Sequence, residues 1–159
     1  MLKKIKHQKK IITINKKSKF NFSIKKYFTA GIVLYGWEVK SIRQGKINIS
    51  HSHIIIRSNE AYLFNCNIQP LKTSNFLNSS NESTRNRKLL LLRKEINFIS
   101  YEIKKYRYTV VPISLFWKRS LCKINIGLAV GKSIYDKRQD KKNKILKKEL
   151  SRISKRFRI

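Results

Sequence analysis

The strong excess of positive charge constrains this chain more than any other feature of its sequence. Its 159 residues include 38 Lys and Arg but only 8 Asp and Glu, so the formal net charge is 38 − 8 = +30. A chain this basic repels itself and needs an anionic partner, for which nucleic acid and an acidic membrane surface are the two candidates. A hydrophobic share of 41% is still enough to form a core, which excludes a wholly disordered polycation.

The positive charge is spread over three parts of the chain. Residues 1–26 carry a net charge of +10, residues 27–131 carry +11 and residues 132–159 carry +9. The length fits one domain with tails. Because flexible basic arms can follow the phosphates of an RNA, we expect a mobile N-terminal arm over residues 1–19, an RNA-binding domain over residues 20–131 and a basic C-terminal tail over residues 132–159.

Membrane and secreted proteins are excluded by the distribution of apolar residues. No stretch approaches the roughly 20 apolar residues of a membrane span. The N-terminus lacks the apolar segment and cleavage site of a secretory signal. Cys66 and Cys122 lie far apart with no CxxC spacing, so we expect reduced, buried thiols rather than a zinc site. These features indicate a cytoplasmic protein with no membrane partner.

An enzyme, such as a nuclease, is the main alternative from another functional class. Metal-dependent cleavage of a phosphodiester needs clustered carboxylates, whereas the acids here are scattered and Asp136 with Asp140 is the only close pair. His51 and His53 share one strand face but have no recognisable carboxylate partner. We therefore predict no catalytic residue, no bound metal and no cofactor.

Short apolar runs with a period of two predict an antiparallel sheet. Such alternation occurs in residues 111–117 and 124–130, on either side of Arg119–Ser120. Residues 28–34 form a short, apolar and partly β-branched run that predicts a further strand. Residues 47–58 and 61–68 flank a turn-like spacer and predict another hairpin, whose second arm is expected to carry Tyr62, Phe64, Cys66 and Ile68 on one face. Because proline cannot donate to a strand ladder, Pro112 favours an edge position or a bulge.

Helical spacing occurs in three segments. WEVKSIRQG predicts a short helix that ends at Gly45, and one helical face in the body is expected to carry Leu92, Ile96, Ile99, Ile103 and Tyr106. A narrow stripe in the tail consists of Leu146, Leu150, Ile153 and Phe157. Repulsion between its lysines weakens such a tail helix. Either phosphates neutralise the lysines and the helix forms on binding, or the tail remains a fluctuating, solvated segment.

These elements predict an α+β fold that is mainly β with helices. Several short strands, two body helices and no βαβ rhythm indicate a small antiparallel barrel carrying helices. Residues 72–86 are rich in Ser and Asn without periodicity and predict a flexible loop. Trp37 and Trp117 are expected in the core.

Three segments resemble the small protein B (SmpB) family of tmRNA-binding proteins. They are AGIVLYGWEVKSIRQGKINIS at residues 30–50, RKLLLLRKEI at residues 87–96 and YTVVPISLFWKRSLCKINIGLAVGKSIYDKR at residues 108–138. All three occur in the family's order and with compatible spacing. The resemblance implies an oligonucleotide-binding-type β-barrel with embedded helices.

The resemblance also implies a task and its partners. Family members bind the tRNA-like domain of tmRNA and deliver it to stalled ribosomes, which then tag the incomplete nascent chain. The expected partners are tmRNA and the ribosome, with elongation factor Tu and alanyl-tRNA synthetase acting through the RNA. Composition alone would equally fit a basic structural ribosomal protein of barrel type.

Family positions identify candidate site residues in this chain. Those matching RNA-binding positions or motifs are Asn15, Lys16, Lys17, Lys19, Glu38, Lys40, Arg43, Leu90, Lys123 and Lys132. Those matching the ribosome and decoding tail, which mimics a codon–anticodon pairing, are Asp136, Lys137, Arg138, Arg152 and Ile153. The sequence departs from the family pattern at Thr29, at Phe20-Asn21-Phe22 and at His51-Ser52-His53, which puts the contacts there in doubt.

Four candidates also have a reading that does not require the family. Glu38 either accepts hydrogen bonds from RNA 2′-hydroxyls or forms a salt bridge to Lys40 or Arg43. Arg87 and Lys88 border the flexible loop, where they either meet phosphate or form a solvated basic patch. Asp136 is expected to cap the start of the tail helix, because a carboxylate there satisfies unpaired amides.

Overall fold

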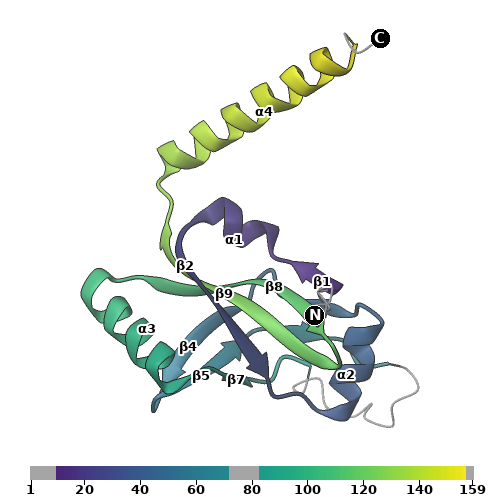
Figure 1. Ribbon diagram of the computed structural model, residues 1–159, viewed down its shortest axis with the longest axis vertical. Helices are drawn as coiled ribbons and strands as arrows, with labels where there is room; N and C mark the ends of the chain where they lie inside the picture. The colour runs from purple at the N-terminus through teal and green to yellow at the C-terminus, as the bar shows by residue number, and fades with distance from the viewer. Residues whose placement is uncertain (1–9, 72–82, 157–159) are drawn as a thin grey trace, which may run out of the picture.

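Alternating apolar side chains build the strands of one large antiparallel sheet in the computed structural model, which describes residues 10–71 and 83–156 (Figure 1). The sheet is ordered β1-β8-β4-β5-β7-β2-β9, and β8 also pairs with β9. Six strands therefore form a closed ring, with β1 as an additional strand on β8. The seven strands are β1 Lys10–Ile14, β2 Phe22–Ile32, β4 His53–Arg57, β5 Glu60–Phe64, β7 Arg87–Leu90, β8 Thr109–Lys118 and β9 Leu121–Gly131.

The remaining described elements are one small sheet and four helices. β3 Ile47–Asn48 pairs with β6 Asn67–Ile68 in a two-stranded sheet. The helices are α1 Lys16–Asn21, α2 Gly36–Arg43, α3 Arg93–Tyr106 and α4 Ile134–Arg156. The predicted α+β class is confirmed.

The core is assembled from side chains of strands that are distant in the sequence. Ala30, Leu63, Leu115, Ile124 and Ile126 are fully buried, and they come from β2, β5, β8 and β9. Burial of each large aliphatic side chain stabilises the fold by about 1.5–3 kcal/mol. The period-two spacing of Ile124 and Ile126 within β9 confirms the predicted strand, although Val130, at the end of that run, is exposed.

The hairpin of β4 and β5 is confirmed, but the four residues expected on one face of its second arm do not share that face. Ser58 and Asn59 both adopt left-handed backbone, as the tight two-residue turn requires. Ala61 and Leu63 are fully buried in β5, whereas Tyr62 and Phe64 are only half-buried. Asn65 has φ of 53° and interrupts the alternation, so the buried face resumes one residue later.

β8 contains the bulge that Pro112 favoured. Pro112 pairs with Ile126 and Ser114 pairs with Asn125, so one residue of β8, Ile113, has no counterpart in the register. The prediction of a bulge is confirmed. The bulged residue also has a role in docking the N-terminal segment, since its carbonyl oxygen accepts a 2.8 Å hydrogen bond from the backbone N–H of Asn15.

Both predicted body helices are present. α2 ends at Arg43, and Gly45 follows with φ of 74°, a left-handed conformation that favours glycine. In α3 the centre of the predicted apolar stripe is buried at Ile96 and Ile99. The ends of that stripe differ from the prediction: Leu92, which precedes the helix, and Tyr106, its last residue, are exposed.

The N-terminal segment is ordered from Lys10 onward, which corrects the prediction of a mobile arm for residues 10–19. β1 pairs with β8, and α1 follows directly, so the predicted boundary at residue 19 falls within a helix. Apolar side chains in KIITI supply strand character that the surrounding lysines obscure. The first nine residues of the predicted arm lie outside the described residues, as does most of the predicted loop at residues 72–86.

Candidate nucleic-acid interface

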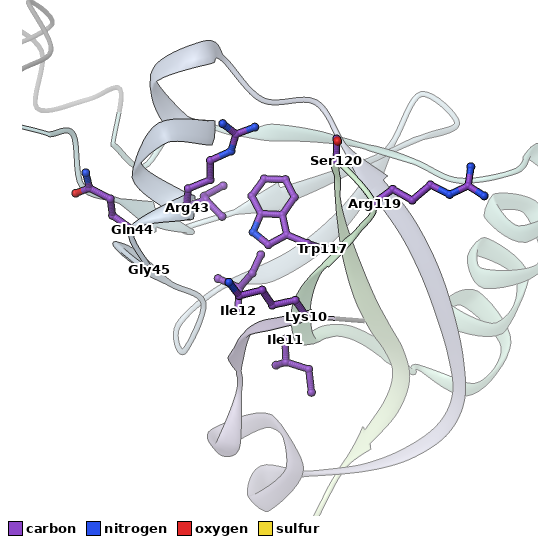
Figure 2. A pocket seen from close by; sticks show the side chains of 10 residues that line it. Lys10, Ile11, Ile12, Arg43, Gln44, Gly45, Trp117, Arg119 and Ser120 are labelled. Carbon is purple, nitrogen blue, oxygen red and sulfur yellow. The ribbon is translucent and has the colours of Figure 1, made fainter. Parts of the chain in front are cut away.

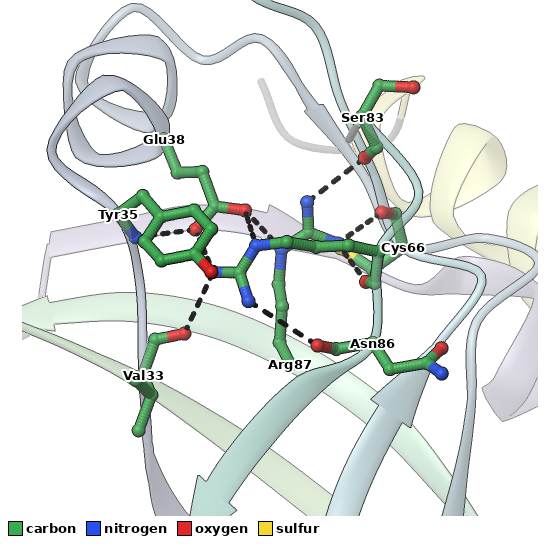
Figure 3. Close-up of polar contacts among 8 residues, drawn as sticks. Val33, Tyr35, Glu38, Cys66, Ser83, Asn86 and Arg87 are labelled. Atoms are coloured by element: carbon green, nitrogen blue, oxygen red, sulfur yellow. Dashed lines mark hydrogen bonds and ion pairs between the residues drawn. The ribbon is translucent and has the colours of Figure 1, made fainter. Parts of the chain in front are cut away.

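A buried ion-pair network lies between α2 and β7 (Figure 3). Glu38 on α2 is fully buried, and its carboxylate accepts hydrogen bonds from Arg87 Nε at 2.8 Å and from Arg85 Nε at 2.9 Å. The backbone N–H of Tyr35 donates to the same carboxylate at 2.7 Å. Arg87 is also fully buried, and its guanidinium donates to the carbonyl oxygens of Cys66, Ser83 and Arg85.

This network corrects the predictions for Glu38 and Arg87. The salt-bridge partners of Glu38 are Arg85 and Arg87 rather than Lys40 or Arg43. Direct contact of either buried side chain with RNA is incompatible with this conformation, because neither reaches solvent. A buried carboxylate needs such compensation, since leaving it unpaired costs several kcal/mol (about 3–5). Sequence reasoning missed Arg85, which is the second guanidinium of the network.

Asn15 is likewise a structural residue in this conformation. Its Oδ1 accepts a 3.0 Å hydrogen bond from the backbone N–H of Ser18 and so caps α1, while its Nδ2 donates to the carbonyl oxygen of Ile49 at 2.9 Å. The residue is buried. Since both ends of the amide are occupied, the predicted contact of Asn15 with RNA is not supported, and its role is to fix α1 on the body.

The lysines that follow Asn15 are presented to solvent by α1. Lys16, Lys17 and Lys19 are all exposed. Lys17 Nζ lies 3.1 Å from His51 Nε2, an arrangement in which the imidazole can accept. α1 therefore displays three cations on a short, capped helix, in a geometry that suits phosphate contacts.

Lys132 lies between the end of β9 and the start of α4, next to α1. Its backbone N–H donates to the carbonyl oxygen of Asn21 at 2.8 Å, and its ammonium donates to the carbonyl oxygen of Lys19 at 3.3 Å. The ammonium also pairs with Asp140 at 2.7 Å. Lys132 thus joins the C-terminal helix to the α1 lysines.

Two further predicted residues flank a glycine in the sheet. Gly31 on β2 pairs with Leu90 on β7 and with Lys123 on β9. Leu90 is 56% exposed and Lys123 is half-buried. Because Gly31 has no side chain between them, the three strands present an apolar side chain and a cation on one open surface. The structure therefore places Leu90 and Lys123, two of the predicted RNA-binding residues, on the same surface.

Beside this surface, the departure at Thr29 is matched by a neutral partner. Thr29 lies opposite Asn125 in the β2–β9 register, and its hydroxyl donates to Asn125 Oδ1 at 2.9 Å. Asn125 Nδ2 in turn donates to Ser114 Oγ at 3.1 Å. Thr29, one of the positions that depart from the family pattern, thus takes part in an uncharged hydrogen-bond relay across three strands.

Lys88 and the α2 cations have different environments. The ammonium of Lys88 pairs with Glu60, and this hydrogen bond lowers the pKa of Glu60 and raises the pKa of Lys88. Part of the Lys88 charge is therefore already compensated. Lys40 and Arg43 are exposed on α2, and Arg43 lies 6.0 Å from the centre of the Trp117 ring.

The C-terminal segment is a helix that extends away from the body (Figure 1). Ser133 Oγ accepts from the backbone N–H of Asp136, and Asp136 Oδ2 accepts from the backbone N–H of Ser133. This reciprocal arrangement is a capping box, so the cap residue is Ser133 and Asp136 is its partner rather than the cap. Lys141 Nζ lies 5.6 Å from the Phe20 ring and adds a contact to α1.

The other predicted tail residues lie on this helix. Lys137 is half-buried near the body, and Arg138 is exposed. Arg152 and Ile153 are exposed near the far end, in the part of α4 that lies away from the sheet. Lys137 and Arg138 therefore lie at the joint, the segment from Lys132 to Lys141 that contacts the body. Arg152 and Ile153 lie on the free portion of α4, which is the helix beyond Lys141.

The buried thiols are unsuited to chemistry in this fold. Burial raises the pKa of Cys66 to about 11 and that of Cys122 to about 12. Both stay protonated near neutral pH and are weak nucleophiles. In residues 10–71 and 83–156, no group of three or more His, Cys, Asp or Glu is placed to receive a metal ion. No helix in those ranges is long and apolar enough to cross a membrane.

The fold and surface together define a class of protein. A closed antiparallel sheet presents lysines, arginines and a few apolar side chains, and a long cationic helix leaves it at one end. This is the arrangement of a basic protein that binds a folded polyanion through its surface.

Comparison with known proteins identifies the family within that class. The SmpB protein family profile matches residues 12–156. An SsrA-binding protein of Buchnera aphidicola subsp. Acyrthosiphon pisum (strain Tuc7) is 51% identical over 158 residues, covering 93% of this chain and 97% of that protein. An SsrA-binding protein of Alkalilimnicola ehrlichii is 41% identical, covering 96% of this chain and 95% of its own.

A solved structure supports the same relationship. It is described as "tmRNA-SmpB: a journey to the center of the bacterial ribosome", is 32% identical, and superposes with a TM-score of 0.62 over 77% of this chain and 85% of that chain. The chain belongs to the SmpB family.

Proposed function

We propose that this chain is an SsrA (tmRNA)-binding protein that acts in trans-translation and is not an enzyme. It binds the tRNA-like domain of tmRNA and delivers that RNA to ribosomes stalled on defective messages. The observation that carries this proposal is the 51% identity to an SsrA-binding protein over almost the full length of both chains. The site of action is the cytoplasm, where the ribosome is.

The RNA-binding surface consists of the α1 lysines together with the Leu90–Gly31–Lys123 surface. Lysines displace counterions from phosphates and supply affinity without reading sequence. The closed ring of strands acts as an oligonucleotide-binding-type barrel, with one open face for unpaired bases. Specificity then comes from the shape of the RNA, its loop bases and its 2′-hydroxyls.

The free portion of α4 serves the ribosome. A cationic helix can occupy the empty messenger channel of a stalled ribosome while the bound RNA takes the place of a tRNA body. Lys137 and Arg138 lie near the joint, and Arg152 and Ile153 lie beyond it, so both groups enter the decoding region along one helix. Elongation factor Tu and alanyl-tRNA synthetase act through the RNA and need no surface on the chain.

The test is binding to the isolated tRNA-like domain of SsrA RNA at several salt concentrations. We expect tight binding, with affinity falling by about 10³–10⁵ from low to moderate salt if six to ten phosphates are engaged. A plain RNA duplex of equal length is the control and should bind far more weakly at moderate salt. Equal affinity for the two RNAs would contradict the proposal. A copy number of one on washed ribosomes would instead favour a structural ribosomal protein.

A further inference from the structure

A basic hollow lies where β1, α2 and the β8–β9 turn meet (Figure 2). Its volume is about 740 Å³, which is large enough for a nucleotide. The residues that line it and matter for its chemistry are Lys10, Ile12, Arg43, Trp117, Arg119 and Ser120. None of the described residues that line the hollow is acidic.

Trp117 forms the aromatic wall of this hollow. The sequence predicted a core position, but the indole is only half-buried. The Arg43 guanidinium carbon lies 6.0 Å from the centre of the ring, at the outer limit of a cation–π contact. Such a contact is weak, so a base can replace the guanidinium over the ring while the guanidinium moves onto a phosphate.

The cations around Trp117 have no carboxylate partner in the part of the chain that the structure describes. Among the described residues, none of Lys10, Arg43 and Arg119 forms an ion pair with a carboxylate. Lys10 and Arg43 approach the indole from β1 and α2, whereas Arg119 extends outward from the turn (Figure 2). The hollow therefore offers two cations beside the ring and a third at its rim.

The turn itself keeps a cation at some conformational cost. Arg119 has φ of 56°, a left-handed conformation in which glycine or asparagine is more stable. Strained backbone of this kind often occurs at functional positions. Here it places a guanidinium at the rim of the hollow.

The hollow also continues into the surface that we assign to RNA. Trp117 and Ser120 line a second, adjoining hollow together with Leu90, Gly31 and Lys123. An RNA strand on the Leu90–Gly31–Lys123 surface can thus pass the β8–β9 turn and reach Trp117 without leaving the protein.

We propose that the Trp117 hollow takes one unpaired RNA nucleotide, with its base stacked on the indole and its phosphates against Arg43 and Lys10. Stacking on an aromatic side chain accepts any base, and Arg and Lys neutralise the phosphates. The occupant is single-stranded RNA, and its binding here rests on the proposed RNA-binding function.

The first experiment observes Trp117 directly by fluorescence. Trp37 is the only other tryptophan. It is buried, and its Nε1 has no hydrogen-bond partner among the described residues, so Trp37→Phe removes no such bond and leaves Trp117 as the sole indole. We expect a six-residue oligoadenylate to quench this fluorescence. The same oligomer with abasic sugars, which has equal charge, should not quench it.

The second experiment measures affinity for the tRNA-like domain of SsrA RNA. Trp117→Leu should weaken binding by roughly five- to 100-fold, the range expected for loss of one stacked base. Arg43→Gln should weaken binding and lower the slope of log affinity against log salt by about 0.7–0.9. Arg57→Gln is the matched control, because Arg57 is exposed at the β4–β5 turn and does not line the hollow.

Arg119→Asn separates binding from folding. Asparagine tolerates the left-handed turn better than arginine, so this variant should melt no lower than the parent and yet bind the RNA more weakly. Quenching by the abasic oligomer equal to that by oligoadenylate would overturn the proposal. So would unchanged affinity in Trp117→Leu and Arg43→Gln while the parent binds the RNA. Failure of the parent itself to bind would overturn the proposed function.

Discussion

The ammonium of Lys132 lies 2.7 Å from the carboxylate of Asp140, and this ion pair joins the end of the body to the second turn of α4. The same ammonium donates to the carbonyl oxygen of Lys19 on α1. Because the pair is partly exposed, it contributes about 0–1 kcal/mol to stability. Its main structural effect is to fix the direction in which α4 leaves the body relative to the α1 lysines.

Truncation of the chain should separate RNA binding from tagging. Stopping after Lys141 retains Asp140, the Lys132 pair and the contact of Lys141 with Phe20. Stopping after Arg138 removes all three. We expect both truncated proteins to bind the tRNA-like domain, because the α1 lysines and Lys123 remain. Neither should support tagging of nascent chains, because the free portion of α4 is lost.

Each truncated protein is the control for the other, because they differ only in the residues that complete the joint. Tagging is measured in a translation reaction stalled on a message without a stop codon. Normal tagging by either truncated protein would contradict the division of labour between body and tail. A loss of RNA binding only on stopping after Arg138 would show that the Lys132–Asp140 joint, rather than the tail beyond it, organises the RNA surface.

Glu38→Gln should strongly destabilise the fold. The substitution removes the charge that compensates the guanidinium groups of Arg87 and Arg85, which leaves a buried cation unpaired at a cost of about 3–5 kcal/mol. Urea unfolding measures the loss. Glu60→Gln is the matched control, because the Glu60–Lys88 pair is exposed and its removal should change stability little.

A double substitution tests the cause of this loss. Glu38→Leu combined with Arg87→Met should be less destabilising than the sum of the two single changes, because the double variant leaves neither Glu38 nor Arg87 as a buried charge without the other. Additive losses would mean that the two side chains do not act as a pair.

Asn15→Ala should lower stability rather than RNA affinity. The change removes the α1 cap and leaves the carbonyl oxygen of Ile49 without its donor, at a combined cost of about 1–2 kcal/mol. Thermal unfolding measures the loss. Lys16→Ala is the contrasting variant, since Lys16 is exposed and should affect RNA affinity and its salt dependence alone. A weaker RNA complex with unchanged stability in Asn15→Ala would indicate direct contact instead.

The buried cysteines should make stability fall in alkaline solution. Their pKa values in the folded protein are about 11 and about 12, above the ordinary value of 9.0. The unfolded chain therefore releases thiol protons first, and the free energy of unfolding falls as pH rises from about 9 to about 11, by about 1.4 kcal/mol per pH unit for each fully titrating thiol.

The variant Cys66→Ala/Cys122→Ala provides the reference for this effect, because tyrosines and lysines also titrate in that range. Urea unfolding at pH 8 and pH 10 should show a steeper loss for the parent than for the variant. Equal slopes would mean that the thiols ionise as readily in the folded state as in the unfolded state.

Local periodicity was sufficient to predict the elements that bury one regular face. β9 and α3 follow their apolar spacing, both predicted hairpins form, and Gly45 lies just after the end of α2 as expected. Single backbone irregularities are not visible in such a pattern. Asn65 therefore divides the expected common face, since one left-handed residue shifts the side chains that follow it: Tyr62 and Phe64 are half-buried before it, whereas Cys66 and Ile68 are buried after it.

The positions of charged residues in the site were harder to predict from the sequence. Arg87 was assigned to the surface because cations are rarely buried without a partner, and its partner Glu38 lies far away in sequence. β7 itself was missed, because the continuous apolar run at residues 89–92 does not distinguish a strand from a helix. Trp117 was assigned to the core by residue type, whereas the adjoining turn leaves it half-exposed.

Closure of the ring has a consequence for the synthesis of this protein. Phe22 at the start of β2 pairs with Gly131 at the end of β9, so the two ends of the body meet only after nearly all of it has been translated. Pairing between such distant segments is slow. A copy interrupted before β9 leaves β2 as an unpaired edge prone to aggregation. A protein that acts on interrupted translation therefore folds only when its own message is translated almost to the end of the β9 segment.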